Sequence, residues 1–202
     1  MGTDMHFCVE HQSTNGDWLR VEDIVTNPNG SRSRAHWYNG RSYILFGVLA
    51  RVRALDVPTI AARRGFPDDA SEETRERYAW CKDELRDASG ETWYTAEDLV
   101  RFDWWHRIPA YVRFNEKASE PARQRAVVAL TQNALQDSPI TTVSRGEPMP
   151  AYQDDWLPVE VPLAYWTHHF QSLVLRLVQV DTLDLTATRA VIWFDQWTDP
   201  SG

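Results

Sequence analysis

Residues 1–11, MGTDMHFCVEH, decide the fold that we predict for this chain. Apolar residues alternate with polar or thiol-bearing ones through this stretch, and a period of two residues is typical of a β-strand with one buried face. The apolar side carries Met5, Phe7 and Val9. The other side carries an acid, an imidazole, a thiol and a second acid, namely Asp4, His6, Cys8 and Glu10. The predicted strand therefore presents a row of ionisable groups opposite its core face.

Two further strands are predicted from the segments that follow this one and from the end of the sequence. Residues 13–17, STNGD, contain the Asn-Gly pair that favours a hairpin turn, and residues 18–25, WLRVEDIV, alternate again. Residues 188–196, TRAVIWFDQ, have the apolar, β-branched composition of a strand. We predict an α+β fold: a small antiparallel sheet formed by the N-terminal hairpin and the C-terminal strand, with helices packed mainly on one face.

Apolar spacings of three and four residues predict helices between these strands. The predicted helices lie within residues 41–55, 71–85, 95–105, 119–136 and 163–180, and residues 110–114 are expected to form a short strand. Thr95 and Asp98 have the spacing of a capping box, which marks a helix start. Residues 26–41 and 137–162 are predicted to be loops, and the second is a long connection with five prolines.

The size and composition are those of one globular domain. The chain has 202 residues, of which 43% are apolar and 25% charged, so we expect a single domain over residues 1–202. The formal net charge of −8 makes this an acidic protein. Free nucleic acid is not expected as a partner, because phosphate binding depends on clustered Lys and Arg. The sequence leaves the oligomeric state open.

The cysteines and the hydropathy pattern indicate a compartment. Cys8 and Cys81 lack the spacing of a metal or redox motif, so we expect two buried free thiols. No apolar run reaches the ~18 residues that a membrane span requires, and no basic segment followed by an apolar one opens the sequence. We therefore expect a cytoplasmic protein without a membrane partner.

Four segments share their order and pattern with a known family. They are MGTDMHFCVE (1–10), RSYILFGVLARVR (41–53), RRGFPDDAS (63–71) and AVIWFDQ (190–196). In these segments the chain resembles a family of uncharacterised proteins from bacteriophages and bacterial genomes, whose pattern is MGxDIHxxxE, RxYxLFxxLAxVR, RGxPxDxS and a final WFD strand. The resemblance implies a phage-type accessory protein in the host-cell cytoplasm, and it implies no particular reaction. Residues 87–95, DASGETWYT, depart from the family pattern, which has an Asp-x-His-Ser-x-Ser segment there.

The acid–histidine row is the first candidate site. Residues two apart on a strand point to one face about 6.5–7 Å apart, so Asp4 and His6 are close enough to share a ligand or a metal ion. Asp195 ends the closing strand and joins them if that strand pairs with the first. We take Asp4, His6, Glu10 and Asp195 as candidate catalytic residues, and the first two with Asp195 as candidate ligands of a divalent metal. The alternative is a structural ion pair between an acid and the histidine.

Arginines supply a second candidate site. Arg41, Arg63 and Arg64 are candidates for binding an anion, because a guanidinium fork suits phosphate or carboxylate and Gly65 permits a tight turn beside them. The alternative is internal pairing, since Asp68 and Asp69 follow immediately.

Two functions remain open at this point. The first is a hydrolase, metal-dependent if the acid–histidine pocket holds a divalent cation, that acts on a phosphoester or a nucleotide. The second is a non-enzymatic protein that inhibits a host defence protein or sequesters a small nucleotide. No phosphate-binding glycine loop, zinc-protease motif or nucleophile-elbow motif is present to favour a known chemistry.

Overall fold

The computed structural model of the chain describes residues 2–26, 32–35, 37, 42–53, 56–85, 88–132, 140–144 and 156–197. The composition predicts a single domain, but the chain divides into two compact units. The first unit comprises residues 1–102 and 169–202, and the second comprises residues 103–168. The second unit has a sheet and an apolar cluster of its own, which is the physical basis of the division.

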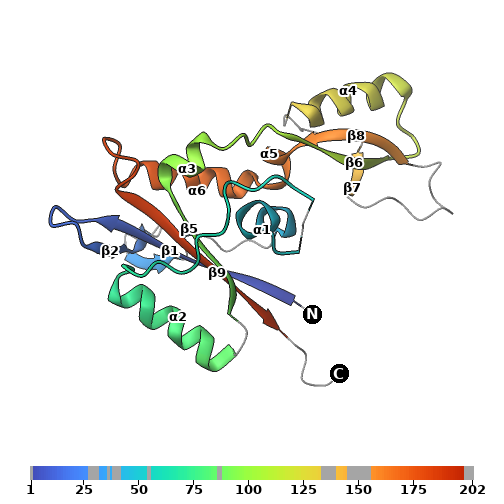
Figure 1. Ribbon diagram of the computed structural model, residues 1–202. Helices are drawn as coiled ribbons and strands as arrows, with labels where there is room; N and C mark the ends of the chain where they lie inside the picture. The colour runs from blue at the N-terminus through green and yellow to red at the C-terminus, as the bar shows by residue number, and fades with distance from the viewer. Residues whose placement is uncertain are drawn as a thin grey trace. The chain divides into compact units, whose positions relative to one another are not determined.

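A four-stranded antiparallel sheet forms the centre of the first unit (Figure 1). Its strands are β1 (Gly2–Gln12), β2 (Trp18–Val21), β5 (Ser89–Thr95) and β9 (Thr188–Trp197), in the order β2-β1-β9-β5. The hairpin of β1 and β2 and the pairing of the last strand with the first confirm the predicted α+β fold class. Strand β5 extends the sheet beyond β9.

The register between β1 and β9 determines which side chains share a face. Asp4 lies opposite Asp195, His6 opposite Trp193, and Glu10 opposite Arg189. Directly opposed residues of an antiparallel pair point to the same side of the sheet. The predicted polar row of β1 is therefore continued by polar and aromatic side chains of β9.

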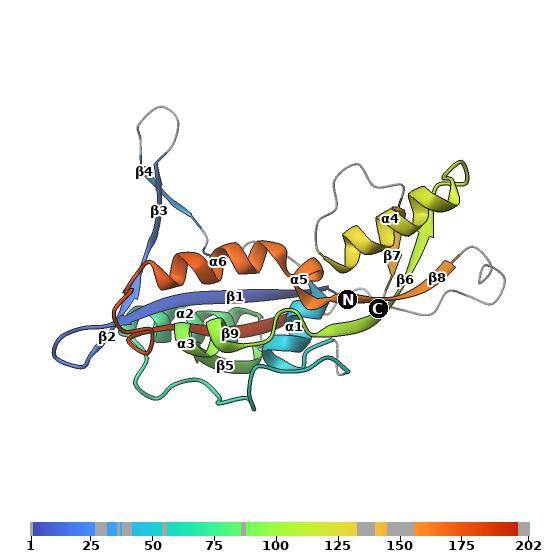
Figure 2. The same cartoon turned by 90° about the horizontal axis from the view of Figure 1, so that it is seen from above.

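Helices contact both faces of this sheet (Figure 2). Helices α1 (Tyr43–Ala50) and α6 (His168–Val178) lie on the apolar face, where Phe46 contacts Phe194 and Phe170 contacts Phe7. Helix α2 (Glu72–Leu85) lies on the other face and packs Cys81 into a buried cluster with Cys8, Val191 and Trp193. The polar row of β1 therefore lies beneath a helix that the sequence did not place there.

Local sequence signals explain where several helices begin and end. Ser42 caps α1 by accepting a hydrogen bond from the Leu45 amide, and α1 ends at Arg51, whose φ of 55° is left-handed. Helix α1 is therefore shorter than the helix predicted within residues 41–55. Helix α3 (Ala96–Arg101) starts with the predicted capping box of Thr95 and Asp98, which is confirmed.

Part of the predicted loop at residues 26–41 is a short hairpin. Strands β3 (Asp23–Thr26) and β4 (Arg32–Ala35) pair in antiparallel fashion, so the loop prediction is wrong for residues 32–35. Residues 32–35, RSRA, show no apolar alternation, so the sequence gives no strand signal there.

The second unit contains a three-stranded antiparallel sheet with the order β7-β6-β8. Its elements are β6 (Arg107–Phe114), α4 (Glu120–Thr131), β7 (Ile140–Ser144), β8 (Trp156–Pro162) and the short helix α5 (Leu163–Trp166). The prediction of an irregular connection over residues 137–162 is therefore wrong at β7 and β8. Prolines suggested a loop, but β8 is an edge strand, where missing amide donors are tolerated.

No described helix has the length and apolar character needed to cross a membrane.

Candidate functional site

A cleft of about 710 Å³ opens between the polar face of the first unit's sheet and helix α2. Its lining consists of His6 from β1, Arg20 from β2, the following Glu22, and Glu73, Glu76, Arg77 and Trp80 from α2. This lining unites one member of the predicted acid–histidine row with charged residues from two other elements.

Helical periodicity explains why these α2 residues share the cleft wall. Positions 73, 76, 77 and 80 follow the spacing i, i+3, i+4, i+7, which places them on one side of a helix. Thr74 and Cys81 lie on the buried side instead, and both are fully buried. Helix α2 therefore packs one side against the sheet and lines the cleft with the other.

His6, which lines the cleft, pairs with the buried Asp195. His6 Nε2 lies 3.0 Å from Asp195 Oδ2, and Asp195 Oδ1 accepts a hydrogen bond of 2.9 Å from the backbone N–H of Asp4. The side chains of His6 and Asp195 are only 16% and 5% exposed. A carboxylate only accepts hydrogen bonds, so the neutral imidazole carries its proton on Nε2 and keeps Nδ1 as an acceptor.

The His6 ring is held by packing as well as by Asp195. It stacks on Trp193 with a centroid separation of 5.4 Å and an interplanar angle of 7°. Cys81 Sγ lies 3.7 Å from Nδ1 and 4.0 Å from Nε2. Because these two distances are nearly equal, the sulfur lies off the axis of either ring nitrogen and makes no well-aligned thiol–imidazole hydrogen bond.

Burial makes both cysteines poor nucleophiles. Burial raises the pKa of the Cys81 thiol, and the neighbouring Trp193 indole and Arg77 only partly oppose that effect. Burial likewise raises the pKa of Cys8, which is 1% exposed. A thiolate is the reactive form of cysteine, so neither group suits a nucleophile at neutral pH. The expectation of two buried free thiols is confirmed.

The lining of the cleft has mixed charge. Arginines 20 and 77 line the cleft together with three glutamates, at positions 22, 73 and 76. Arg20 lies opposite Glu10 in the hairpin and therefore points to the same side of the sheet as His6. A ligand with one anionic group and several hydrogen-bond donors fits this lining better than a polyanion does.

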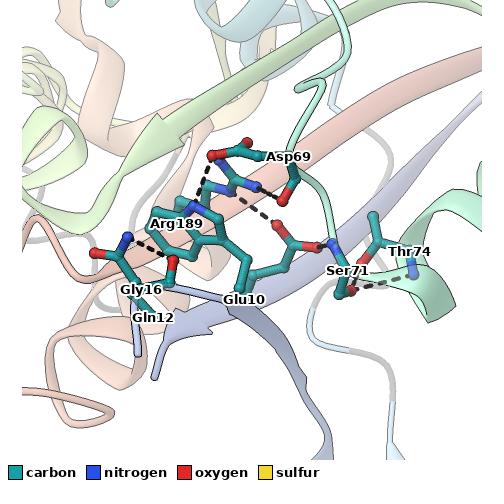
Figure 3. Close-up of polar contacts among 8 residues, drawn as sticks. Glu10, Gln12, Gly16, Asp69, Ser71, Thr74 and Arg189 are labelled. Carbon is teal, nitrogen blue, oxygen red and sulfur yellow. Dashed lines mark hydrogen bonds and ion pairs between the residues drawn. The ribbon is translucent and has the colours of Figure 1, made fainter. Parts of the chain in front are cut away.

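Glu10 belongs to a separate buried network (Figure 3). Glu10 Oε2 accepts a hydrogen bond of 2.8 Å from Arg189 Nε, and Oε1 accepts one of 2.8 Å from the Ser71 amide. Arg189 also binds Asp69 and lies 3.9 Å above the Trp18 ring. Four residues of strand separate the Cα atoms of Glu10 and His6 by about 13 Å, so the two side chains do not act at one centre.

This network fixes the start of helix α2. The backbone amide of Ser71 donates to Glu10. The Ser71 hydroxyl in turn accepts a hydrogen bond from the Thr74 amide in the first turn of the helix. Glu10 thus connects the buried arginine of β9 to the first turn of the helix that forms the cleft wall. The prediction that Glu10 is a catalytic group of the acid–histidine row is not supported, because its carboxylate is already bound on both oxygens.

The predicted metal ligands do not form a metal site in the described part of the chain. Asp4, His6 and Asp195 share a face, but no three His, Cys, Asp or Glu side chains among the described residues are arranged to hold a metal ion. Both Asp195 oxygens are engaged, one by the Asp4 amide and one by the imidazole. The metal prediction is therefore replaced by an imidazole–carboxylate pair.

Two of the predicted anion-binding arginines, Arg63 and Arg64, lie outside the cleft lining. Arg64 pairs with Asp98 at 2.6 Å and stacks over Trp93 at 4.6 Å, so the alternative of internal pairing applies to it, with Asp98 as the partner. Arg63 is exposed, and Arg41 lies outside the described residues. The cleft instead uses Arg20 and Arg77, which sequence reasoning missed. Their signal was present in the alternation of the hairpin and in the helical spacing of residues 73–80.

Comparisons with protein-family models, with curated proteins and with solved structures found no match. The resemblance to a phage protein family therefore remains a prediction.

Proposed function

We propose that the cleft binds an anionic phosphoester and that His6, oriented by Asp195, is the acid–base group that hydrolyses it. The observation that carries this proposal is the imidazole–carboxylate pair at the edge of a cleft that also presents two guanidinium groups. General acid–base catalysis requires a titratable group that is held in one orientation beside the substrate. Asp195 and the Trp193 stack provide that orientation.

The proposed step uses water as the nucleophile. The imidazole nitrogen that Asp195 does not bind accepts a proton from water as the water oxygen forms a bond to phosphorus. The P–O bond to the leaving alcohol breaks, and the proton then passes from the imidazolium to the departing oxygen. Asp195 stabilises the transient imidazolium, as a carboxylate does in other imidazole–carboxylate pairs.

Arg77 and Arg20 are assigned to the phosphoryl oxygens. A guanidinium group offers paired N–H donors whose geometry matches phosphate, and it keeps its charge at any working pH. The charge of Arg77 also acts on the Cys81 thiol, which contacts His6.

A binding protein without turnover is the second candidate. The mixed charge of the cleft and the exposed residue Trp80 in its wall also suit a protein that holds a small nucleotide without reacting with it. The two candidates use the same cleft and differ in whether His6 affects a reaction rate.

The test is the hydrolysis of p-nitrophenyl phosphate and bis(p-nitrophenyl) phosphate by purified protein. The His6→Gln variant should lower kcat by about 10²–10⁴-fold, the usual contribution of a general acid–base group. Asp195→Asn should lower kcat while its amide oxygen still accepts from the Asp4 amide. His11→Gln is the matched control, because His11 lies on the same strand but binds Thr188 outside the cleft lining. Turnover that survives in His6→Gln contradicts the proposal.

A further inference from the structure

Trp80 is an exposed aromatic residue in the wall of the cleft. Its side chain lines the cleft with His6 and Arg77, and 58% of the residue's surface is accessible. It follows Arg77 by three residues on α2, so the two side chains leave the same side of the helix about one turn apart. An aromatic ring and a guanidinium group thus line the same cleft as the imidazole.

We propose that the ligand of this cleft is a nucleoside monophosphate whose base stacks on Trp80 and whose phosphate binds Arg77. This inference rests on the proposed function for the binding of an anion at Arg77. It adds that a planar base of the same ligand binds at Trp80. Aromatic side chains that stack on a base provide affinity with little dependence on sequence, because every base has a π-face.

The dimensions of the wall agree with this ligand. A separation of three residues corresponds to about 4.5 Å along a helix axis, and both side chains are long enough to widen that span to the length of a ribose. The cleft volume of about 710 Å³ lies within the range of small-molecule sites, roughly 300–1,000 Å³.

The glutamates of the cleft select among nucleotides. Glu73 and Glu76 share the α2 wall with Trp80, and their carboxylates accept hydrogen bonds from exocyclic amino groups of a base. Uracil has no such group. The three carboxylates in the lining also oppose each additional phosphate by like-charge repulsion. The cleft should therefore prefer AMP to UMP and AMP to ATP.

Calorimetric titration of the full chain tests whether the Trp80 ring contributes to nucleotide binding. AMP should bind more tightly than ribose 5-phosphate or inorganic phosphate. Trp80→Ala should weaken AMP binding by about 10–100-fold, the loss expected when a base loses its stacking partner, and should leave ribose 5-phosphate binding unchanged. Trp105→Ala is the matched control, since Trp105 is 59% exposed and is not part of the cleft lining. Equal affinity for AMP and ribose 5-phosphate overturns the inference, as does unchanged AMP binding in Trp80→Ala.

The outcomes separate this inference from the proposed function. AMP binding that depends on Trp80, without hydrolysis of any phosphoester, supports the nucleotide site and contradicts the hydrolase. Hydrolysis that depends on His6, together with AMP affinity equal to that of ribose 5-phosphate, supports the hydrolase and overturns the nucleotide site. Thermal melting of each variant distinguishes lost binding from lost folding.

Discussion

His6 Nε2 lies 3.0 Å from Asp195 Oδ2, although 189 residues separate the two in the sequence. The contact is diagonal, because His6 is directly opposite Trp193 while Asp195 is opposite Asp4. Diagonal neighbours across an antiparallel pair are within reach of long or aromatic side chains. The pairing of the first and last strands therefore creates the one imidazole–carboxylate pair on which our proposal depends.

Removing one partner of the buried ion pair of Arg189 should destabilise the first unit strongly. The Arg189 and Glu10 side chains are 2% and 0% exposed. Arg189→Leu leaves the Glu10 charge buried without its partner. We therefore expect the free energy of unfolding, measured by urea denaturation, to fall by about 3–5 kcal/mol. Arg101→Leu removes a pair with Glu97 in which Arg101 is 77% exposed, and it should change stability by less than about 1 kcal/mol. Equal effects of the two variants would refute this ranking.

Gly90 should tolerate alanine less well than Gly65. Both have positive φ, +69° and +74°, so alanine at either site incurs a left-handed cost of about 1–2 kcal/mol. A Cβ at position 90 would also lie 3.0 Å from atoms of Phe194 and Val52, whereas position 65 has open space. We expect Gly90→Ala to lower the free energy of unfolding by about 1–3 kcal/mol more than Gly65→Ala does. Denaturation curves that coincide for the two variants would show that the sheet relaxes around the added methyl group.

The two thiols should be unreactive in the folded protein. Cys8 and Cys81 are 1% and 0% exposed, and burial raises the pKa of each. Ellman's reagent should therefore detect no fast thiol under native conditions and two thiols in guanidinium chloride. One thiol that reacts within seconds in native buffer would contradict the assignment of Cys81 as a packing residue beside His6.

Asp98 should contribute stability that is lost in acid. Burial acts to raise the pKa of this carboxyl, but the Arg64 hydrogen bond and the Thr95 amide lower the pKa below the ordinary value of 3.8. A folded pKa below the unfolded value stabilises the fold above pH 3.8, and this contribution disappears as the pH falls through the folded pKa.

The corresponding measurement is urea denaturation across a pH series. Asp98→Asn should be less stable than the natural sequence at pH 7, and the difference should close in acid. Arg64→Leu should reduce the same acid dependence, since it removes the main partner of Asp98. A gap that persists unchanged to low pH would mean that the carboxylate charge is not the source of the stability.

Strands β1, β2 and β9 of the central sheet were predictable from local sequence signals. Residues of β1 keep the two-residue period of a half-buried strand, and those of β9 are the most β-prone at the other end of the sequence. Strands β7 and β8 were missed, because prolines at the edge strand β8 gave the same signal as a loop. Pairing between distant segments can override such local signals.

The site was only partly predictable. Alternation places His6 and Glu10 on one face, but strand spacing alone does not tell that Glu10 is bound by Arg189 and by the first turn of α2. That outcome depends on the register of β9, since a shift by one residue turns every side chain to the other face. Arg77 and Trp80 became site residues only because α2 lies over the polar face.

The ¹⁵N chemical shifts of the His6 imidazole test the central claim most directly, because they report which ring nitrogen carries the proton. With Asp195 Oδ2 at 3.0 Å, the neutral ring should carry its proton on Nε2 in the natural sequence, and Asp195→Asn should yield a mixture of both tautomers. A ring protonated on Nδ1 in the natural sequence would contradict the account, because Asp195 would then not orient the acid–base group of the cleft.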